Sequence, residues 1–94
     1  MDKKETEIAA GQRAEQILTD PVFIAAREHI DAELYRLFTS AVPTDLEALS
    51  QIKAMQYMHG KYLQYLQKVV NDGKLAKLDV ERKPRHSASE FGYR

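Results

Sequence analysis

Residues 44–73 read TDLEALSQIKAMQYMHGKYLQYLQKVVNDG and carry the signals that decide the fold. Thr44 and Glu47 have the spacing of a capping box, in which each side chain bonds an unpaired backbone N–H at the start of a helix. Gly73 stands where helices commonly end in the left-handed conformation. The pattern therefore predicts one long helix over residues 45–72, about 42 Å in length.

An apolar stripe follows one side of this predicted helix. Its members recur at helical spacing and are Ala48, Ile52, Met55, His59, Tyr62, Leu63, Leu66, Val69 and Val70. Heptad spacing fits an overlapping series, namely Leu49, Ile52, Gln56, His59, Leu63, Leu66 and Val70. Polar residues in such a seam fix register or oligomer state. Because one small globule cannot cover so long a helix, we expect other copies to contact His59, Gln56, Leu63 and Leu66.

Two shorter helices are predicted before the long one. Asp20 followed by Pro21 is a start signal, because aspartate caps helices and proline is tolerated at the first helical position. Residues 21–40 then place their apolar side chains on one face, which predicts a helix that returns antiparallel to the long one. Residues 5–18 have a weaker pattern and predict a short helix. The expected fold is all-α, an antiparallel helical hairpin with a short N-terminal helix in a single domain over residues 1–80.

The C-terminal segment, residues 81–94, lacks this apolar spacing and is expected to form an extended tail. Its basic residues include Arg82, Lys83 and Arg85. Phe91 and Tyr93 are large aromatic residues in an otherwise polar segment. Such residues act as anchors when they insert into a pocket of another chain, so both are predicted partner contacts.

Composition excludes several kinds of site. The 94-residue chain has no cysteine, which excludes disulfides, thiolate nucleophiles and cysteine-based metal centres. Its 14 Lys and Arg residues balance 14 Asp and Glu residues, so no bulk positive charge attracts nucleic acid. Phosphate-binding glycine loops and the G-x-S-x-G motif are absent, and paired carboxylates have no cleft in which to meet. We expect no enzyme activity, no cofactor, no metal and no small-molecule substrate.

Signals for membranes and export are also absent from the sequence. No run of about 18 apolar residues is present, and the N-terminal MDKKETE lacks the hydrophobic core of a signal peptide. We therefore expect no membrane contact and no secretion by a signal peptide.

His59 is the first candidate for chemistry, since histidine titrates near neutral pH. It lies in the middle of the apolar stripe. The positions one turn away hold Met55, Gln56, Tyr62 and Leu63, which supply no second metal ligand of the histidine or carboxylate type. This setting favours a histidine hydrogen-bonded across a helix interface over a metal ligand or an acid–base group.

A polar face of the long helix is the second candidate. It carries Lys53, Tyr57, Lys61 and Lys68, and lysines beside an aromatic ring can bind phosphates and stack on bases. A solvated face, whose tyrosine covers the lysine stems, explains the same pattern and is favoured. Nucleic-acid contact through these four residues and through Arg82, Lys83 and Arg85 is the alternative.

Two strings carry a resemblance to a known group of proteins. They are RAEQILTDPVFIAA, which leads into the second predicted helix, and VVNDGKLAKL, which precedes the basic tail. Over residues 12–80 the chain resembles small uncharacterised bacteriophage and prophage proteins from DNA-packaging and head gene regions. The resemblance implies a phage particle or its packaging machinery as the setting, in the virion or the host cytoplasm. It transfers no catalytic or binding residue.

The sequence thus predicts a non-enzymatic subunit of an oligomeric assembly, for example a head-associated, portal-associated or DNA-packaging protein. Its expected partners are other copies of the chain and other phage structural proteins. Two alternatives stay open: a nucleic-acid-binding helical module, and a small phage-encoded inhibitor that binds a host protein.

Overall fold

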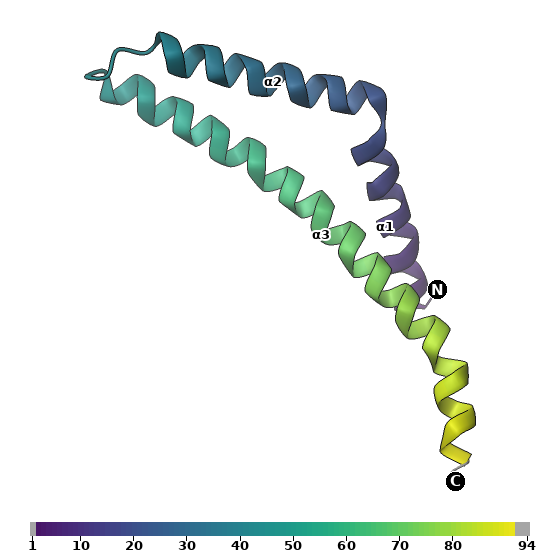
Figure 1. The fold of residues 1–94 in the computed structure, drawn as a ribbon. Helices are drawn as coiled ribbons and strands as arrows, with labels where there is room; N and C mark the ends of the chain where they lie inside the picture. Colours follow the sequence, from purple (N-terminus) through teal and green to yellow (C-terminus); the bar gives the residue numbers. More distant parts are fainter. Residues whose placement is uncertain (1, 92–94) are drawn as a thin grey trace. The chain divides into compact units, whose positions relative to one another are not determined.

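The computed structural model describes the backbone of residues 2–91 and the side chains of residues 2–82. It contains three α-helices, α1 (Lys3–Thr19), α2 (Pro21–Ser40) and α3 (Leu46–Phe91), shown in Figure 1. No strand occurs among the described residues. The prediction of an all-α fold is therefore confirmed.

Aspartate residues cap the two helices that follow a connection. Asp20 accepts hydrogen bonds from the backbone N–H groups of Val22, at 2.8 Å, and Phe23, at 3.2 Å, so the predicted start of α2 is confirmed. At α3 the Asp45 carboxylate accepts from the N–H of Ala48 at 3.1 Å. The predicted capping box is therefore wrong by one residue, because Asp45 immediately precedes the helix and Thr44 does not.

The end of α3 differs from the prediction. Gly73 does not terminate the helix, and no described residue has a positive φ. The helix continues to Phe91, so the segment expected to be extended from residue 81 is helical up to that residue. Adding residues to an existing helix avoids the costly nucleation step, which allows a segment without an apolar face to continue it. Tyr93 lies outside the described residues.

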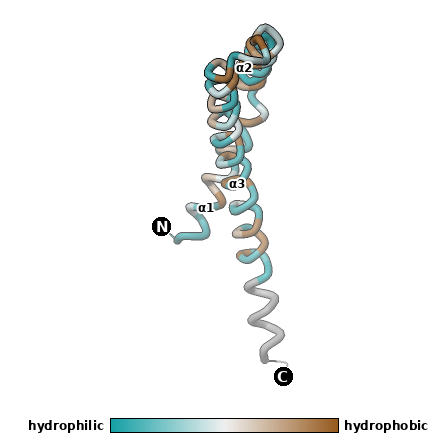
Figure 2. Tube along the Cα trace, turned by 90° about the vertical axis from the view of Figure 1, so that its left-hand side faces the viewer, coloured by the Kyte–Doolittle hydropathy of each residue, from teal (hydrophilic) through white to brown (hydrophobic). Residues whose placement is uncertain are grey.

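The chain divides into two compact units. The terminal unit combines Met1–Gln16 with Leu66–Arg94, and the central unit is Ile17–Tyr65. Figure 2 shows that apolar positions recur along the helices at intervals. Over the described residues, no helix has an apolar segment of the length needed to cross a membrane.

Small residues hold the terminal unit together. A Cβ atom placed on Gly11 would lie 2.9 Å from the Cα of Gly73, so α1 and α3 approach backbone to backbone. Ala14, Val70 and Ala76 are buried around this contact. Further along, the Nζ of Lys4 lies 3.0 Å from the Asp79 carboxylate. Gly73 therefore serves helix packing, and not the helix termination predicted for it.

The central unit joins α2 to the first part of α3 through few buried side chains. Ile52 and His59 are buried, whereas Phe23, Leu34 and Leu37 of α2 are partly exposed. No large hydrophobic side chain in the described part of the chain is fully buried. One copy therefore provides only a thin core for this unit.

Candidate functional site

His59 connects the two helices of the central unit. Its Nε2 lies 3.1 Å from the Oδ1 of Asp31 on α2, and its Nδ1 lies 3.1 Å from the hydroxyl oxygen of Tyr62, one turn along α3. The His59 and Tyr62 rings meet edge to face, with centroids 5.6 Å apart. The side chain of His59 is only 9% exposed. The expected histidine hydrogen-bonded across a helix interface is confirmed.

These partners define the hydrogen-bonding roles of the neutral ring. A carboxylate accepts hydrogen bonds only, so the Nε2 of His59 carries the proton and donates to Asp31. The Nδ1 then accepts from the hydroxyl group of Tyr62. Both ring nitrogens are engaged in this arrangement. In the part of the chain with described side chains, no group of three His, Cys, Asp or Glu residues is placed to hold a metal ion.

A cleft of about 480 Å³ lies next to His59 within the central unit. Its walls are lined by Asp31, Leu34, Tyr35, Phe38, Ile52, Gln56 and His59. The volume falls in the range of ligand pockets, which are mostly apolar with a few polar groups. However, Tyr35 and Phe38 on the α2 wall are largely exposed, so the cleft is an open groove and provides no enclosed site for chemistry.

A second feature of the central unit is a row of exposed side chains along α3, which we name the Met–Tyr stripe. It consists of Met55, Met58, Tyr62 and Tyr65, spaced three, four and three residues apart. Their exposed fractions are 46%, 62%, 45% and 65%. This spacing is that of a coiled-coil seam, in which a neighbouring helix covers each side chain.

The sequence prediction placed the partner contacts on a different face. His59 is buried against α2, and Gln56 lines the cleft. Leu63 and Leu66 are partly exposed. His59 therefore contributes to packing within one copy, whereas partner contacts through Gln56, Leu63 and Leu66 stay a prediction. Of the predicted tail contacts, Phe91 has a described backbone but no described side chain, and Tyr93 is outside the described residues.

Neither Met58 nor Tyr65 was among the partner contacts predicted from the sequence. Met55 and Tyr62 were assigned to the apolar stripe as part of the helix face to be buried. The Met–Tyr stripe has a heptad spacing of its own, which is offset along α3 from the series that contains His59. This spacing is the signal by which the sequence could have distinguished the two series.

The polar face of α3 is more fully paired than the sequence suggested. The Nζ of Lys61 lies 5.3 Å from the centre of the Tyr57 ring, and the Nζ of Lys68 lies 2.7 Å from the Asp72 carboxylate. A ring covered by a lysine is less available for stacking on a base. Lys53 is exposed. This pairing favours the solvated face over the nucleic-acid contact.

The basic cluster near the C-terminus is only partly described. The guanidinium group of Arg82 lies 3.8 Å from the carboxylate of Asp79, within α3. Lys83 and Arg85 belong to the helical backbone, but their side chains are outside the described set. The described side chain of this cluster, Arg82, is therefore paired within its own helix.

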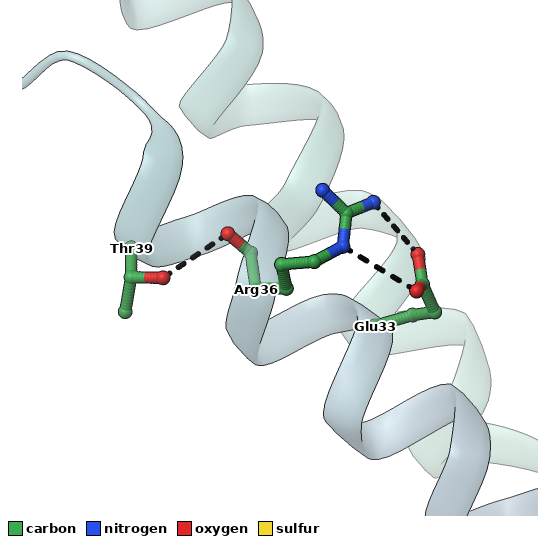
Figure 3. A network of polar contacts seen from close by, with 3 residues as sticks. All are labelled: Glu33, Arg36 and Thr39. Atoms are coloured by element: carbon green, nitrogen blue, oxygen red, sulfur yellow. Dashed lines mark hydrogen bonds and ion pairs between the residues drawn. The ribbon is translucent and has the colours of Figure 1, made fainter.

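Exposed ion pairs account for the shifted pKa values. Figure 3 shows Arg36 on α2 with its guanidinium group beside Glu33, at an N–O distance of 2.9 Å. The hydrogen bond from Arg36 lowers the pKa of Glu33, and the same bond raises the pKa of Arg36. The hydrogen bond with Asp79 likewise raises the pKa of Lys4. These exposed pairs lie outside the cleft and the stripe.

No family model, curated protein or solved structure matches this chain.

Proposed function

We propose that this chain is a non-enzymatic subunit of an oligomeric assembly, in which other copies cover helical faces that a single copy leaves exposed. One observation carries the proposal. Among the described side chains, 14 large apolar ones are at least 37% exposed, whereas the buried hydrophobic residues are Ile52, Val70 and two alanines. Scattered exposed apolar residues are ordinary, but four of these side chains, the Met–Tyr stripe, follow one face of α3, and a contiguous apolar set marks an interaction surface.

The central unit supplies the framework of the proposed subunit. We propose that α2 and the first part of α3 form an antiparallel helical hairpin. Support comes from the Asp31–His59 hydrogen bond at the middle of α2 and from Phe38 and Ile52, which line the same cleft nearer the connection. A hairpin of this kind presents two flanks, one with the cleft and one with the Met–Tyr stripe.

The proposed biological setting is a phage particle or its DNA-packaging machinery, either in the virion or in the bacterial host. The sequence resemblance over residues 12–80 supports this setting. The partners are then other copies of the chain and other phage structural proteins, with Phe91 and Tyr93 proposed as anchors on a neighbour. In this proposal the lysine face remains solvated, as its internal pairing indicates.

The solution mass of the full chain tests this proposal. Light scattering over a range of concentrations, at low and high salt, is expected to give a mass that is a multiple of 10.8 kDa. Salt screens contacts between exposed charges but not apolar contacts, so the multiple should persist at high salt. A mass of 10.8 kDa at every concentration would contradict the proposal.

A further inference from the structure

We propose that two copies of the chain pair through the Met–Tyr stripe, with the two α3 helices antiparallel. This inference rests on the proposed function, because it names the interface by which the subunits associate. The occupant of the stripe is a second copy of the same stripe.

The Met–Tyr stripe lies on α3 beside the face that packs within the central unit. Ile52 and His59, on the neighbouring face, are buried in contact with the rest of the central unit. The stripe lies beside this face and is about half exposed along its whole length. Its spacing of three, four and three residues follows a heptad, with Met55 and Tyr62 at one seam position and Met58 and Tyr65 at the other. The packing within one copy therefore leaves the four side chains of this seam about half uncovered, with Tyr62 also in contact with His59.

The side chains that cover such a seam must match its spacing. A heptad seam is covered best by another helix with the same spacing, because its side chains then fit into the gaps between those of the first helix. Every copy of the chain carries such a helix. In an antiparallel pair, a two-fold axis midway between Met58 and Tyr62 places Met55 opposite Tyr65 of the second copy and Met58 opposite Tyr62.

The side-chain chemistry then favours the antiparallel direction over the parallel one. All four contacts in the antiparallel pair join a methionine to a tyrosine, and the thioether sulfur makes favourable contacts with aromatic rings. A parallel pair would instead place methionine on methionine and tyrosine on tyrosine. The Tyr65 hydroxyl group stays at the edge of the pair, where water reaches it, whereas the Tyr62 hydroxyl keeps its hydrogen bond with His59.

Charge along the stripe is low. Between Met55 and Tyr65 the only charged residue is Lys61, with no acidic residue. The ammonium group of Lys61 lies over the Tyr57 ring, which is outside the stripe. In the antiparallel pair, the Lys61 residues of the two copies lie on the same side of the interface. Because salt screens their repulsion, association through the stripe is expected to be kept or strengthened as salt increases.

The area available indicates the strength of the pair. A fully exposed tyrosine or methionine presents on the order of 200 Å², so four half-exposed side chains supply roughly 400 Å² per copy and about 800 Å² per pair. This is below about 1,000 Å², the lower limit for a specific and stable interface. We therefore expect a weak, concentration-dependent dimer, or one contact of a larger assembly.

Disulfide mapping tests the pairing directly, since the chain has no cysteine of its own. Met55→Cys and Tyr65→Cys are prepared separately, checked for helical content by circular dichroism, mixed and oxidised under mild conditions. Intact-mass analysis separates the mixed disulfide from the two symmetric ones. The antiparallel pair predicts the mixed 55–65 disulfide in at least a several-fold excess over the 55–55 and 65–65 products. Tyr57→Cys is the control, because Tyr57 is as exposed as Tyr65 but lies outside the stripe.

The outcomes separate the inference from the proposed function. If the symmetric products dominate, or if Tyr57→Cys cross-links with Tyr65→Cys as readily as Met55→Cys does, the antiparallel stripe pairing is wrong. The proposed function still holds in that case, provided that the unmodified chain has an oligomeric mass. If the unmodified chain is monomeric at every concentration, the proposed function and the inference fail together.

Discussion

Gly11 and Gly73 bring α1 and α3 into direct backbone contact in the terminal unit. A Cβ atom on Gly73 would lie 2.9 Å from the Cα of Gly11 and 2.9 Å from the carbonyl oxygen of Glu7. Both neighbouring atoms belong to the backbone, so neither can move aside cheaply. The two glycines thus allow an approach between the helices that any larger residue would prevent.

Gly73→Ala is therefore expected to destabilise the fold, although alanine favours a helix over glycine by about 1 kcal/mol. Gly60→Ala is the matched control, since a Cβ at Gly60 meets no atom within 4 Å. The control should gain about 1 kcal/mol from helix propensity alone. Chemical denaturation followed by circular dichroism measures both variants. Equal stabilisation by the two substitutions would show that the helices do not touch at Gly73.

The Asp31–His59 hydrogen bond gives a second prediction, for the central unit. Asp31→Ala removes the acceptor from the buried Nε2–H group of His59. The free energy of unfolding is expected to fall by about 1 to 3 kcal/mol, because a buried N–H group is left without its acceptor. Glu28→Ala, at an exposed position on the same helix, should have a much smaller effect. An equal loss in both variants would mean that the bond contributes no stability.

The Glu33–Arg36 pair predicts a pH effect with a definite sign. Arg36 holds the pKa of Glu33 below its ordinary value of 4.5. The unfolded chain therefore binds a proton at Glu33 more readily than the folded chain does. The pair stabilises the folded state above pH 4.5, and this stabilisation is lost as the pH falls through the lowered pKa of Glu33. Arg36→Gln should raise the pKa of Glu33 towards 4.5 in an NMR titration, whereas Arg27→Gln should leave it unchanged. A pKa unaffected by Arg36→Gln would exclude the pairing in solution.

The aromatic anchors near the C-terminus give a prediction about association. The double variant Phe91→Ala, Tyr93→Ala should keep the helical signal of the fold and weaken association at least several-fold, because aromatic anchors dominate interface energies. The control is Ser87→Ala, Ser89→Ala in the same segment, which should associate as the unmodified chain does. Sedimentation velocity measures both. Unchanged association in the first variant would remove Phe91 and Tyr93 from the proposed interface.

Local signals allowed much of the helical fold to be predicted. Asp20 and Pro21 define the start of α2 through short-range bonding and a restricted backbone, and both effects can be read from neighbouring residues. Periodicity also indicated a histidine at a helix interface. The all-α class followed from these signals without any long-range information.

Long-range contacts account for what the sequence did not predict. Glycine serves both helix ends and close helix contacts, and the choice at Gly73 depends on Gly11, which is distant in sequence. In the same way, two heptad series overlap on α3, and the sequence does not say which of them faces α2. In the structure, the series that contains His59 packs against α2, and the Met–Tyr stripe, which contains Tyr65, is the exposed one.

Sedimentation velocity of Tyr65→Ala beside Tyr57→Ala shows whether copies of the chain associate through the Met–Tyr stripe. Tyr65 and Tyr57 lie on the same helix and are 65% and 61% exposed, so the two substitutions remove similar exposed surfaces. Only Tyr65 belongs to the Met–Tyr stripe. We predict that Tyr65→Ala weakens self-association about tenfold or more, whereas Tyr57→Ala associates like the unmodified chain. Equal association of the two variants would contradict an assembly built through the stripe.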